Sequence, residues 1–540
     1  MSQNSDDTPT GPIGAAGILG PPPRDRLAIE NRTRRWNTLR DIAGGVLVVV
    51  AVFLPWNLYF GVGIPNSNGT LFAVLVVLTL LSLVALIVTR VGPWKSSGAP
   101  RLRLLLNVPY WLLVIAFVVF DAFETIRFGN TVNVPGGVGP GAWLGIAGSV
   151  LIAQPVLTDA GDELRYRRWL KAAQITGYAS MFGAALSSGF HLCWRIRYAL
   201  QGSEGFGKQN VAVIVTAVVY GVVALAAVLI ASRWLLQNTK ASRFAALGLG
   251  ASTIVAGIVV WSLPIGREID AFHGIAQNTT TAGVGYEGYL AWAAAAALFA
   301  PLTLFSSART AERDVWRTAI RKGLLLIAVW CLGSVLMRMT DLVVSVMLNY
   351  PFSRYDSMTL AAFDLATAVL ALWLRVNLAN KAVSPRRVTA LSGFLFTLTV
   401  ARVIVGVVLA PRFQDNPGAS QNPVYGNNLA QQITSIFDVT LCGLALCILV
   451  AAIIAGRVRQ RRPRRIRRRR PTAAPGPGQM GQPGAGRAGA PPVPSEARTT
   501  QFAVAGQSHD APRIFRGDDS ATRQIPVNMP KIFRPPDNPS

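Results

Sequence analysis

The stretch LFAVLVVLTLLSLVALIVT at residues 71–89 decides the fold class. It contains no charged residue and is apolar on every face, so it lacks the alternation of a half-buried strand. At 1.5 Å per residue, it is long enough to cross the roughly 30 Å hydrocarbon layer of a bilayer as a helix. Similar runs recur from residue 42 to residue 456, and they predict an all-α, polytopic transmembrane helix bundle.

About twelve spans are predicted, arranged as six out-and-back hairpins. Their predicted bounds are 42–60, 70–89, 104–126, 142–157, 175–194, 211–232, 244–264, 289–306, 324–348, 358–379, 389–410 and 433–456. The fourth span is short and contains Pro155, which favours a tilted or broken helix at that point.

The basic residues predict an orientation. The first 41 residues hold six Arg and residues 457–470 hold ten, whereas the loops after the odd-numbered spans together hold seven Lys and Arg. Because the basic side of a membrane protein faces the cytoplasm, we expect a protein of the plasma (inner) membrane with both termini in the cytoplasm.

Four regions follow from this pattern. They are a basic cytoplasmic N-terminal segment (1–41), the transmembrane domain (42–456), an Arg-rich juxtamembrane segment (457–470) and a Pro/Gly-rich cytoplasmic tail (471–540) that is expected to be disordered.

The net charge of +26 is explained mainly by this topology. The Arg-rich segment is expected to bind anionic lipid headgroups, at about 1 kcal/mol per basic residue near the surface. No folded nucleic-acid module accompanies it, so no nucleic-acid partner is predicted. The tail is a candidate for binding cytoplasmic proteins.

Five charged residues fall inside predicted spans: Arg338, Asp341, Asp364, Arg402 and Asp438. Charge at the centre of a membrane helix costs about 2.5–3.5 kcal/mol on insertion scales, so these side chains should face protein. Two interpretations stay open. The residues either line a polar path for ions, protons or an anionic headgroup, or they form structural ion pairs that fix helix register.

The last two hairpins look like copies of one another. AAFDLATAVLALWL (361–374) aligns with TSIFDVTLCGLALCIL (434–449) on Phe-Asp and on the following Leu-Ala-Leu, and Arg338 aligns with Arg402 in the preceding spans. Each hairpin therefore carries one Arg on the way out and one Asp on the way back. Asp341, one turn from Arg338, is expected to compete with Asp364 for it.

A second polar group occurs near the outer ends of the third, fifth and seventh spans. It comprises Asp121, Glu124, His191, Glu268, Asp270 and His273. It is read either as an outward-facing cation or proton site or as ordinary solvated helix ends. No His pair has the i, i+4 spacing of a zinc site, and we predict no metal, no cofactor and no catalytic residue.

Three threonines follow acidic residues and precede a large apolar residue by three positions: Thr10, Thr499 and Thr522. This spacing resembles bacterial Ser/Thr kinase sites read by forkhead-associated domains. The resemblance implies phosphorylation, which would add negative charge beside the Arg-rich segment.

The Ala/Gly/Arg-rich composition and the Pro-rich tail resemble uncharacterised multi-pass membrane proteins of high-GC actinobacteria. Three functions remain open. The first is a transporter or permease for a small molecule or lipid, and the second is a non-enzymatic scaffold or regulator of cell-envelope assembly that recruits partners through its tail. The third is a polyprenol-dependent glycosyltransferase or lipid-modifying enzyme, disfavoured because the first outer loop, GVGIPNSNG, has no acidic residue.

Overall fold

The computed structural model divides the chain into two units, Met1–Arg464 and Arg465–Ser540. The structure describes twelve ranges, all within the first unit: 23–57, 59–64, 66–91, 99–128, 137–157, 163–201, 206–263, 285–310, 313–349, 354–379, 383–409 and 436–457. The Arg-rich segment after Arg457, the tail and the threonines Thr10, Thr499 and Thr522 lie outside these ranges.

Helices make up nearly all of the described chain. They are α1 (Pro23–Val52), α2 (Gly69–Val91), α3 (Ala99–Phe128), α4 (Pro140–Ala153), α5 (Glu163–Gln201), α6 (Lys208–Gln237), α7 (Lys240–Ser262), the π-helix η2 (Gly285–Leu290), α9 (Ala291–Thr310), α10 (Arg313–Leu348), α11 (Arg354–Ala379), α12 (Pro385–Leu409) and α14 (Ile436–Arg457). Within the described ranges, a single bridge between Asn57 and Phe60 is the only β-type pairing. The predicted all-α class is therefore confirmed.

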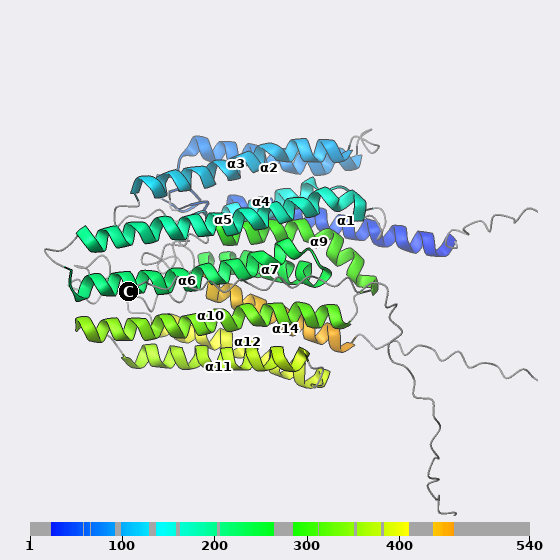
Figure 1. Cartoon of the computed structure of the whole chain (residues 1–540). Helices are drawn as coiled ribbons and strands as arrows, with labels where there is room; N and C mark the ends of the chain where they lie inside the picture. Colours follow the sequence, from blue (N-terminus) through cyan, green and yellow to red (C-terminus); the bar gives the residue numbers. More distant parts are fainter. Residues whose placement is uncertain are drawn as a thin grey trace, which may run out of the picture. The chain divides into compact units, whose positions relative to one another are not determined.

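The helices of Met1–Arg464 run roughly alongside one another, as Figure 1 shows. Neighbours in sequence pack together in α5 with α6, α7 with α9, α10 with α11 and α12 with α14. Helix α14 also packs against α7 and α10. The first predicted hairpin differs, because α1 makes its most extensive contacts with α4 and fewer with α2.

Eight described helices are long and apolar enough to cross a membrane: α2, α3, α6, α7, α10, α11, α12 and α14. They indicate a multi-pass membrane protein, but they are fewer than the twelve predicted spans. A described helix lies at each of the other four predicted positions, where α1, α4, α5 and α9 are found, yet none of these has the required length and hydropathy.

Three of these helices fall short for reasons visible in their sequences. Helix α1 begins at Pro23, inside the predicted N-terminal segment, and ends at Val52, so its apolar part is much shorter than the predicted span 42–60. Helix α5 is 39 residues long, but basic residues occupy both of its ends and Gly, Ser and Tyr dilute its middle. The apolar part of α9 is the short stretch Gly288–Leu304.

Helix α4 is a core helix. It has 14 residues, about 21 Å at 1.5 Å per residue, and every residue except Ile146 is buried. It ends at Ala153, two residues before Pro155, because the residue before a proline disfavours the helical conformation. Apolar helices of this length are more often buried core helices than membrane spans.

The N-terminus of α4 is held by the connection between α1 and α2. The amide of Gly139 donates to the carbonyl of Trp56 (2.7 Å) and the amide of Gly141 donates to the carbonyl of Pro55 (2.8 Å). These bonds satisfy amides that have no partner within the helix. A Cβ on Gly141 would lie 2.5 Å from the Trp56 ring, so only glycine fits there.

Close packing of α7 on α9 gives a test of the fold. A Cβ on Gly250 would lie 2.5 Å from Cβ of Ala296 and still closer to the carbonyl oxygen of Trp292, whereas a Cβ on Gly189 in α5 would meet no atom within 4 Å. We expect Gly250→Ala to lower the free energy of unfolding by about 1–3 kcal/mol, the usual effect of overpacking. Gly189→Ala should leave it unchanged or raise it by up to about 1 kcal/mol, because alanine favours helix.

The measurement is thermal unfolding of the two purified variants in detergent, followed by a thiol-reactive dye that reports exposure of the buried Cys331 and Cys442. Equal melting temperatures for both variants would contradict the described contact between α7 and α9.

Candidate functional site

The five charged residues predicted to lie inside spans form one buried cluster on four helices. Arg338 and Asp341 lie on α10, Asp364 on α11, Arg402 on α12 and Asp438 on α14. None of these residues is more than 4% exposed, and Asp364 is fully buried. The structure thus brings together five side chains that lie up to 100 positions apart in the sequence.

Arg402 lies at the centre of the cluster. Its Nε pairs with Oδ1 of Asp364 and its Nη1 with Oδ1 of Asp438, while its Nη2 donates to Oγ of Ser334 at 3.4 Å. A guanidinium presents its N–H groups in a planar fork, so one side chain can hold two carboxylates on different helices. Arg402 therefore ties α12 to α10, α11 and α14.

Arg338 joins the cluster through Asp364. Its Nε lies 3.4 Å from Oδ2 of Asp364, so this carboxylate is shared by two guanidiniums. Each of the two similar hairpins contains its own Arg–Asp contact, Arg338 with Asp364 and Arg402 with Asp438. The contact between Arg402 and Asp364 crosses from one hairpin to the other and was not predicted.

Asp341 has a different partner from the one expected. Instead of competing for Arg338, its Oδ2 accepts a hydrogen bond of 2.5 Å from the hydroxyl of Tyr220 on α6. Two atoms nearby are buried and have no hydrogen-bond partner, namely Oδ1 of Asp341 and Nη1 of Arg338. An unsatisfied buried polar atom costs about 1–3 kcal/mol or more, so this pair marks a place with unused hydrogen-bonding capacity.

Aromatic side chains enclose the other end of the cluster. Trp330 Nε1 donates to Oδ1 of Asp438 at 2.6 Å, and the Trp330 ring packs edge-on against Phe437 with centroids 4.8 Å apart. Phe437 also contacts Trp292, at 5.8 Å between centroids. All three rings are at most 1% exposed. Oδ1 of Asp438 is therefore bound both by the Arg402 guanidinium and by the Trp330 indole.

Sequence reasoning missed Trp330, Ser334 and Tyr220. The first two could have been found, because Trp330, Ser334, Arg338 and Asp341 are spaced by four, four and three residues and so share one face of α10. Tyr220 lies 121 residues from Asp341 in sequence and carries no comparable signal.

A second buried charge cluster joins α1, α2 and α3. The Asp41 carboxylate accepts hydrogen bonds from Arg40 Nη2 (2.9 Å) and from Arg103 Nη2 (3.1 Å), and Arg103 Nε also donates to Thr89 Oγ1 at 2.9 Å. Arg40 Nη1 reaches the carbonyl of Pro155 at 2.6 Å, just beyond the end of α4. Every member is held by another, and we interpret this cluster as structural.

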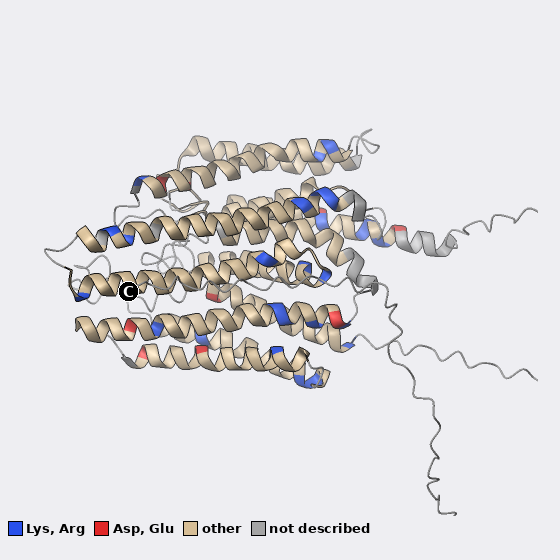
Figure 2. Cartoon of the chain, in the orientation of Figure 1, with Lys and Arg blue, Asp and Glu red and all other residues tan. Residues whose placement is uncertain are grey.

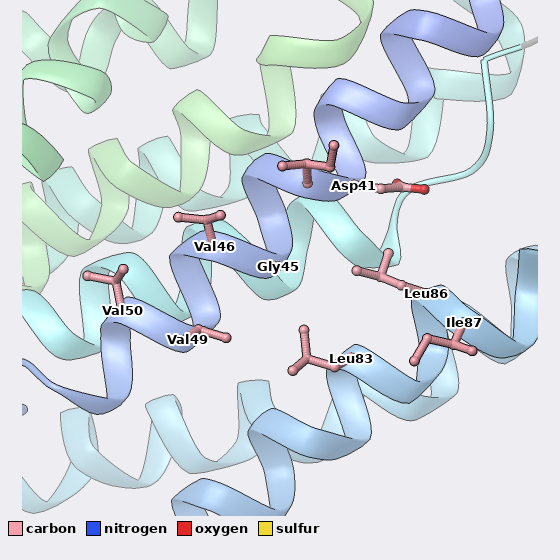
Figure 3. Close-up of a pocket in the computed structure, with 9 residues that line it drawn as sticks. Asp41, Gly45, Val46, Val49, Val50, Leu83, Leu86 and Ile87 are labelled. Carbon is pink, nitrogen blue, oxygen red and sulfur yellow. The ribbon is translucent and has the colours of Figure 1, made fainter.

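An open groove of about 500 Å³ lies between α1 and α2. It is lined by Asp41, Ile42, Gly45, Val46, Val49, Val50, Leu83, Leu86 and Ile87. Figure 3 shows Val49 of α1 and Leu83 of α2 facing the space between the two helices, with Asp41 at one end. Because the Asp41 carboxylate already pairs with two arginines, the groove offers mainly hydrocarbon contact.

The predicted outer-end polar group can be followed only in part. Asp121 is buried at 5% exposure on α3, and Glu124 lies three residues further on the same helix. The side chain of His191, on α5, and residues Glu268, Asp270 and His273 lie outside the part that the structure describes. Among the described residues, no group of three or more His, Cys, Asp or Glu side chains is placed to hold a metal ion.

The central position of Arg402 can be tested by comparison with a surface pair. Arg402→Met leaves Asp364 and Asp438 buried without their main counter-charge, and we expect it to lower the free energy of unfolding by about 3–5 kcal/mol. In the control, Arg317→Met removes a 3.7 Å pair with the exposed Asp314, and such pairs contribute about 0–1 kcal/mol. Denaturant titration of both purified variants measures the difference, and equal losses would show that the cluster does not hold the helices together.

Comparison with known proteins identifies a family but no activity. A family model described as a domain of unknown function, DUF7937, matches residues 37–457, which include every described helix from α2 to α14 and most of α1. No curated protein and no solved structure matches the chain. Because the matched region covers well over half of the sequence, the chain belongs to the DUF7937 family.

Proposed function

We propose that this protein is a transporter- or permease-like protein of the plasma membrane whose substrate is a small molecule or a lipid. The observation that carries the proposal is the buried cluster on α10, α11, α12 and α14, which holds three aspartates but only two arginines. Moving a charged solute or a proton across a membrane requires polar groups within the bundle, and buried ionisable residues are the usual form of such a path.

A purely structural role predicts a different composition. Ion pairs that only fix helix register are most stable when each charge has a partner and each polar atom a hydrogen bond. Here the charges of Arg402, Asp364 and Asp438 each face an opposite charge, but Asp341 is an additional carboxyl group and its Oδ1 has no hydrogen-bond partner. The excess acidic group favours the polar path over structural ion pairs alone.

The proposed topology has about twelve crossings. In addition to the eight long apolar helices, α1, α4, α5 and α9 would lie within the bilayer by packing against neighbours that shield their polar or short segments. Figure 2 shows more Lys and Arg positions, in blue, toward one end of the described helices than toward the other. We assign that end, with both termini, to the cytoplasm of a bacterial cell of the actinobacterial type.

The test of function is complementation of a deletion strain, assayed for uptake of solutes and for envelope lipids. Asp364→Asn with Asp438→Asn removes both charges that hold Arg402, and we expect this variant to lose uptake at least tenfold at normal expression. Asp314→Asn is the matched control, because Asp314 lies on α10 but its side chain is 64% exposed. A chain stopped after Arg470 tests the tail.

Each outcome distinguishes the alternatives. Rescue by the truncated chain together with failure of the double Asn variant supports transport. Failure of the truncated chain with rescue by the double variant supports a scaffold or regulator that recruits partners through residues 471–540. Altered envelope lipids with normal uptake in every strain would favour a lipid-modifying enzyme.

The orientation has its own test. A reporter enzyme that is active only outside the cytoplasm, and one that fluoresces only inside, are fused after Arg457 and after Gln201, the final residues of α14 and α5. We expect the cytoplasmic reporter to be active after Arg457 and the external reporter after Gln201. The opposite pattern at both sites would invert the proposed orientation, and the same pattern at both sites would remove a crossing.

A further inference from the structure

We infer that Asp341 is the binding site for a single proton and that Arg338 exchanges between Asp364 and Asp341 as this proton leaves and returns. The inference rests on the proposed function and deepens it, because it names the proton as the ion that the buried cluster binds. Its test reads the proton directly and requires no knowledge of the transported substrate.

The charge of the cluster is the first step. With all groups ionised, Asp341, Asp364 and Asp438 contribute three negative charges, while Arg338 and Arg402 contribute two positive charges. An uncompensated charge in a low-dielectric interior is costly, and a buried group avoids that cost by becoming neutral. One proton on one aspartate makes the five-residue cluster neutral.

The contacts select Asp341 as the residue that binds the proton. Asp364 is held by Arg402 and Arg338, and Asp438 by Arg402 and Trp330, so both of these carboxylates have partners that favour the charged form. Asp341 has the Tyr220 hydroxyl on Oδ2 and no partner on Oδ1. Oδ1 is therefore the position where an O–H bond can form without displacing another contact.

Among the groups around Asp341, Arg338 is the cation that can change partner when Asp341 loses its proton. Helix α10 packs against α6, α7, α11 and α14. The titratable groups near the cluster from these helices are Tyr220 of α6, Asp364 of α11, and Asp438 and Cys442 of α14, and α10 itself adds Cys331. The basic residues of α7, Lys240 and Arg243, occupy its first turn, far along the helix from this level.

The geometry of Arg338 fits two positions. Its Nε contacts Asp364 at 3.4 Å, while its Nη1 has no hydrogen-bond partner. Asp341 follows three residues later on the same helix, where side chains one turn apart can meet. When Asp341 loses its proton to water, its carboxylate attracts Nη1 of Arg338. When a proton from water binds Oδ1, the carboxyl group is neutral and Arg338 returns to Asp364, which Arg402 holds throughout.

Asp341 lies near the end of its helix. Asp341 lies seven residues before Leu348, the end of α10, or about 10 Å along the helix at 1.5 Å per residue. On the same helix, Arg338 lies three residues further from that end. A proton that enters from this end of α10 therefore meets Asp341 before Arg338, and the change of partner at Arg338 passes its effect on to the ion pairs between the last two hairpins.

The test is infrared difference spectroscopy of the purified full chain in lipid nanodiscs, recorded between acid and alkaline pH in water and in deuterium oxide. We expect a protonated-carboxyl band that disappears at alkaline pH in the wild type. Asp341→Asn should remove one component of this band, which the wild-type-minus-variant double difference isolates, whereas the exposed control Asp314→Asn should retain that component. A double difference without this component overturns the inference.

Tyr220→Phe provides a second variant that keeps the aspartate and nearly the same volume. Loss of the hydroxyl removes the hydrogen bond that stabilises the Asp341 carboxylate, so the band should persist to higher pH. An unchanged titration would contradict the assignment to Asp341. Loss of the band on adding sodium at constant pH would show that the site binds a metal cation instead.

The spectroscopic assay tests the proton site and the transport assay tests the proposed function, so each proposal can be refuted without the other. A titrating Asp341 in a protein that moves no solute refutes the proposed function and leaves the proton site intact. Uptake that is unaffected by Asp341→Asn, in a protein without the band, refutes the proton site and leaves transport intact.

Discussion

The ion pairs of Arg402 with Asp364 and Asp438 are the interaction on which the second half of the structure depends. Charges within an apolar layer cannot be left to solvent, so each must be matched by a side chain from another helix. That requirement limits how far α11, α12 and α14 can slide or rotate relative to one another. Apolar packing alone would tolerate such shifts more readily, because lipid and aliphatic side chains are chemically alike.

The two similar hairpins share this constraint unequally. Both supply an arginine and an aspartate, but Val405 stands in the second hairpin where Asp341 stands in the first, and no tyrosine partner is needed there. The residues that both hairpins share, one Arg and one Asp each, therefore provide matched charges. Asp341, which only the first hairpin has, provides the additional acid and the hydrogen bond to Tyr220 of α6. A cluster that combines a fixed charged centre with one adjustable neighbour can couple a chemical event to a change in helix contacts.

The fold class was predictable because long runs without charge leave no alternative to membrane helices, as residues 71–89 show. The positions of the buried charges were also visible from the sequence. The contact of Arg402 with Asp364 and the bond of Tyr220 to Asp341 were not, because both depend on which helices become neighbours in three dimensions. The count of twelve long apolar helices was wrong at α1, α4, α5 and α9, because a short or diluted apolar run is equally compatible with lipid contact and with burial against protein.

Burial of α4 has a consequence for biosynthesis. A 14-residue helix is too short to be recognised as a membrane segment by hydropathy when it emerges from the ribosome. Its amides at Gly139 and Gly141 are satisfied by the connection after α1, and its end is met by Arg40, so it becomes stable only when α1 is already present. Correct placement of α4 therefore depends on α1, and a mutation in α1 that removes these contacts would destabilise α4 without changing its sequence.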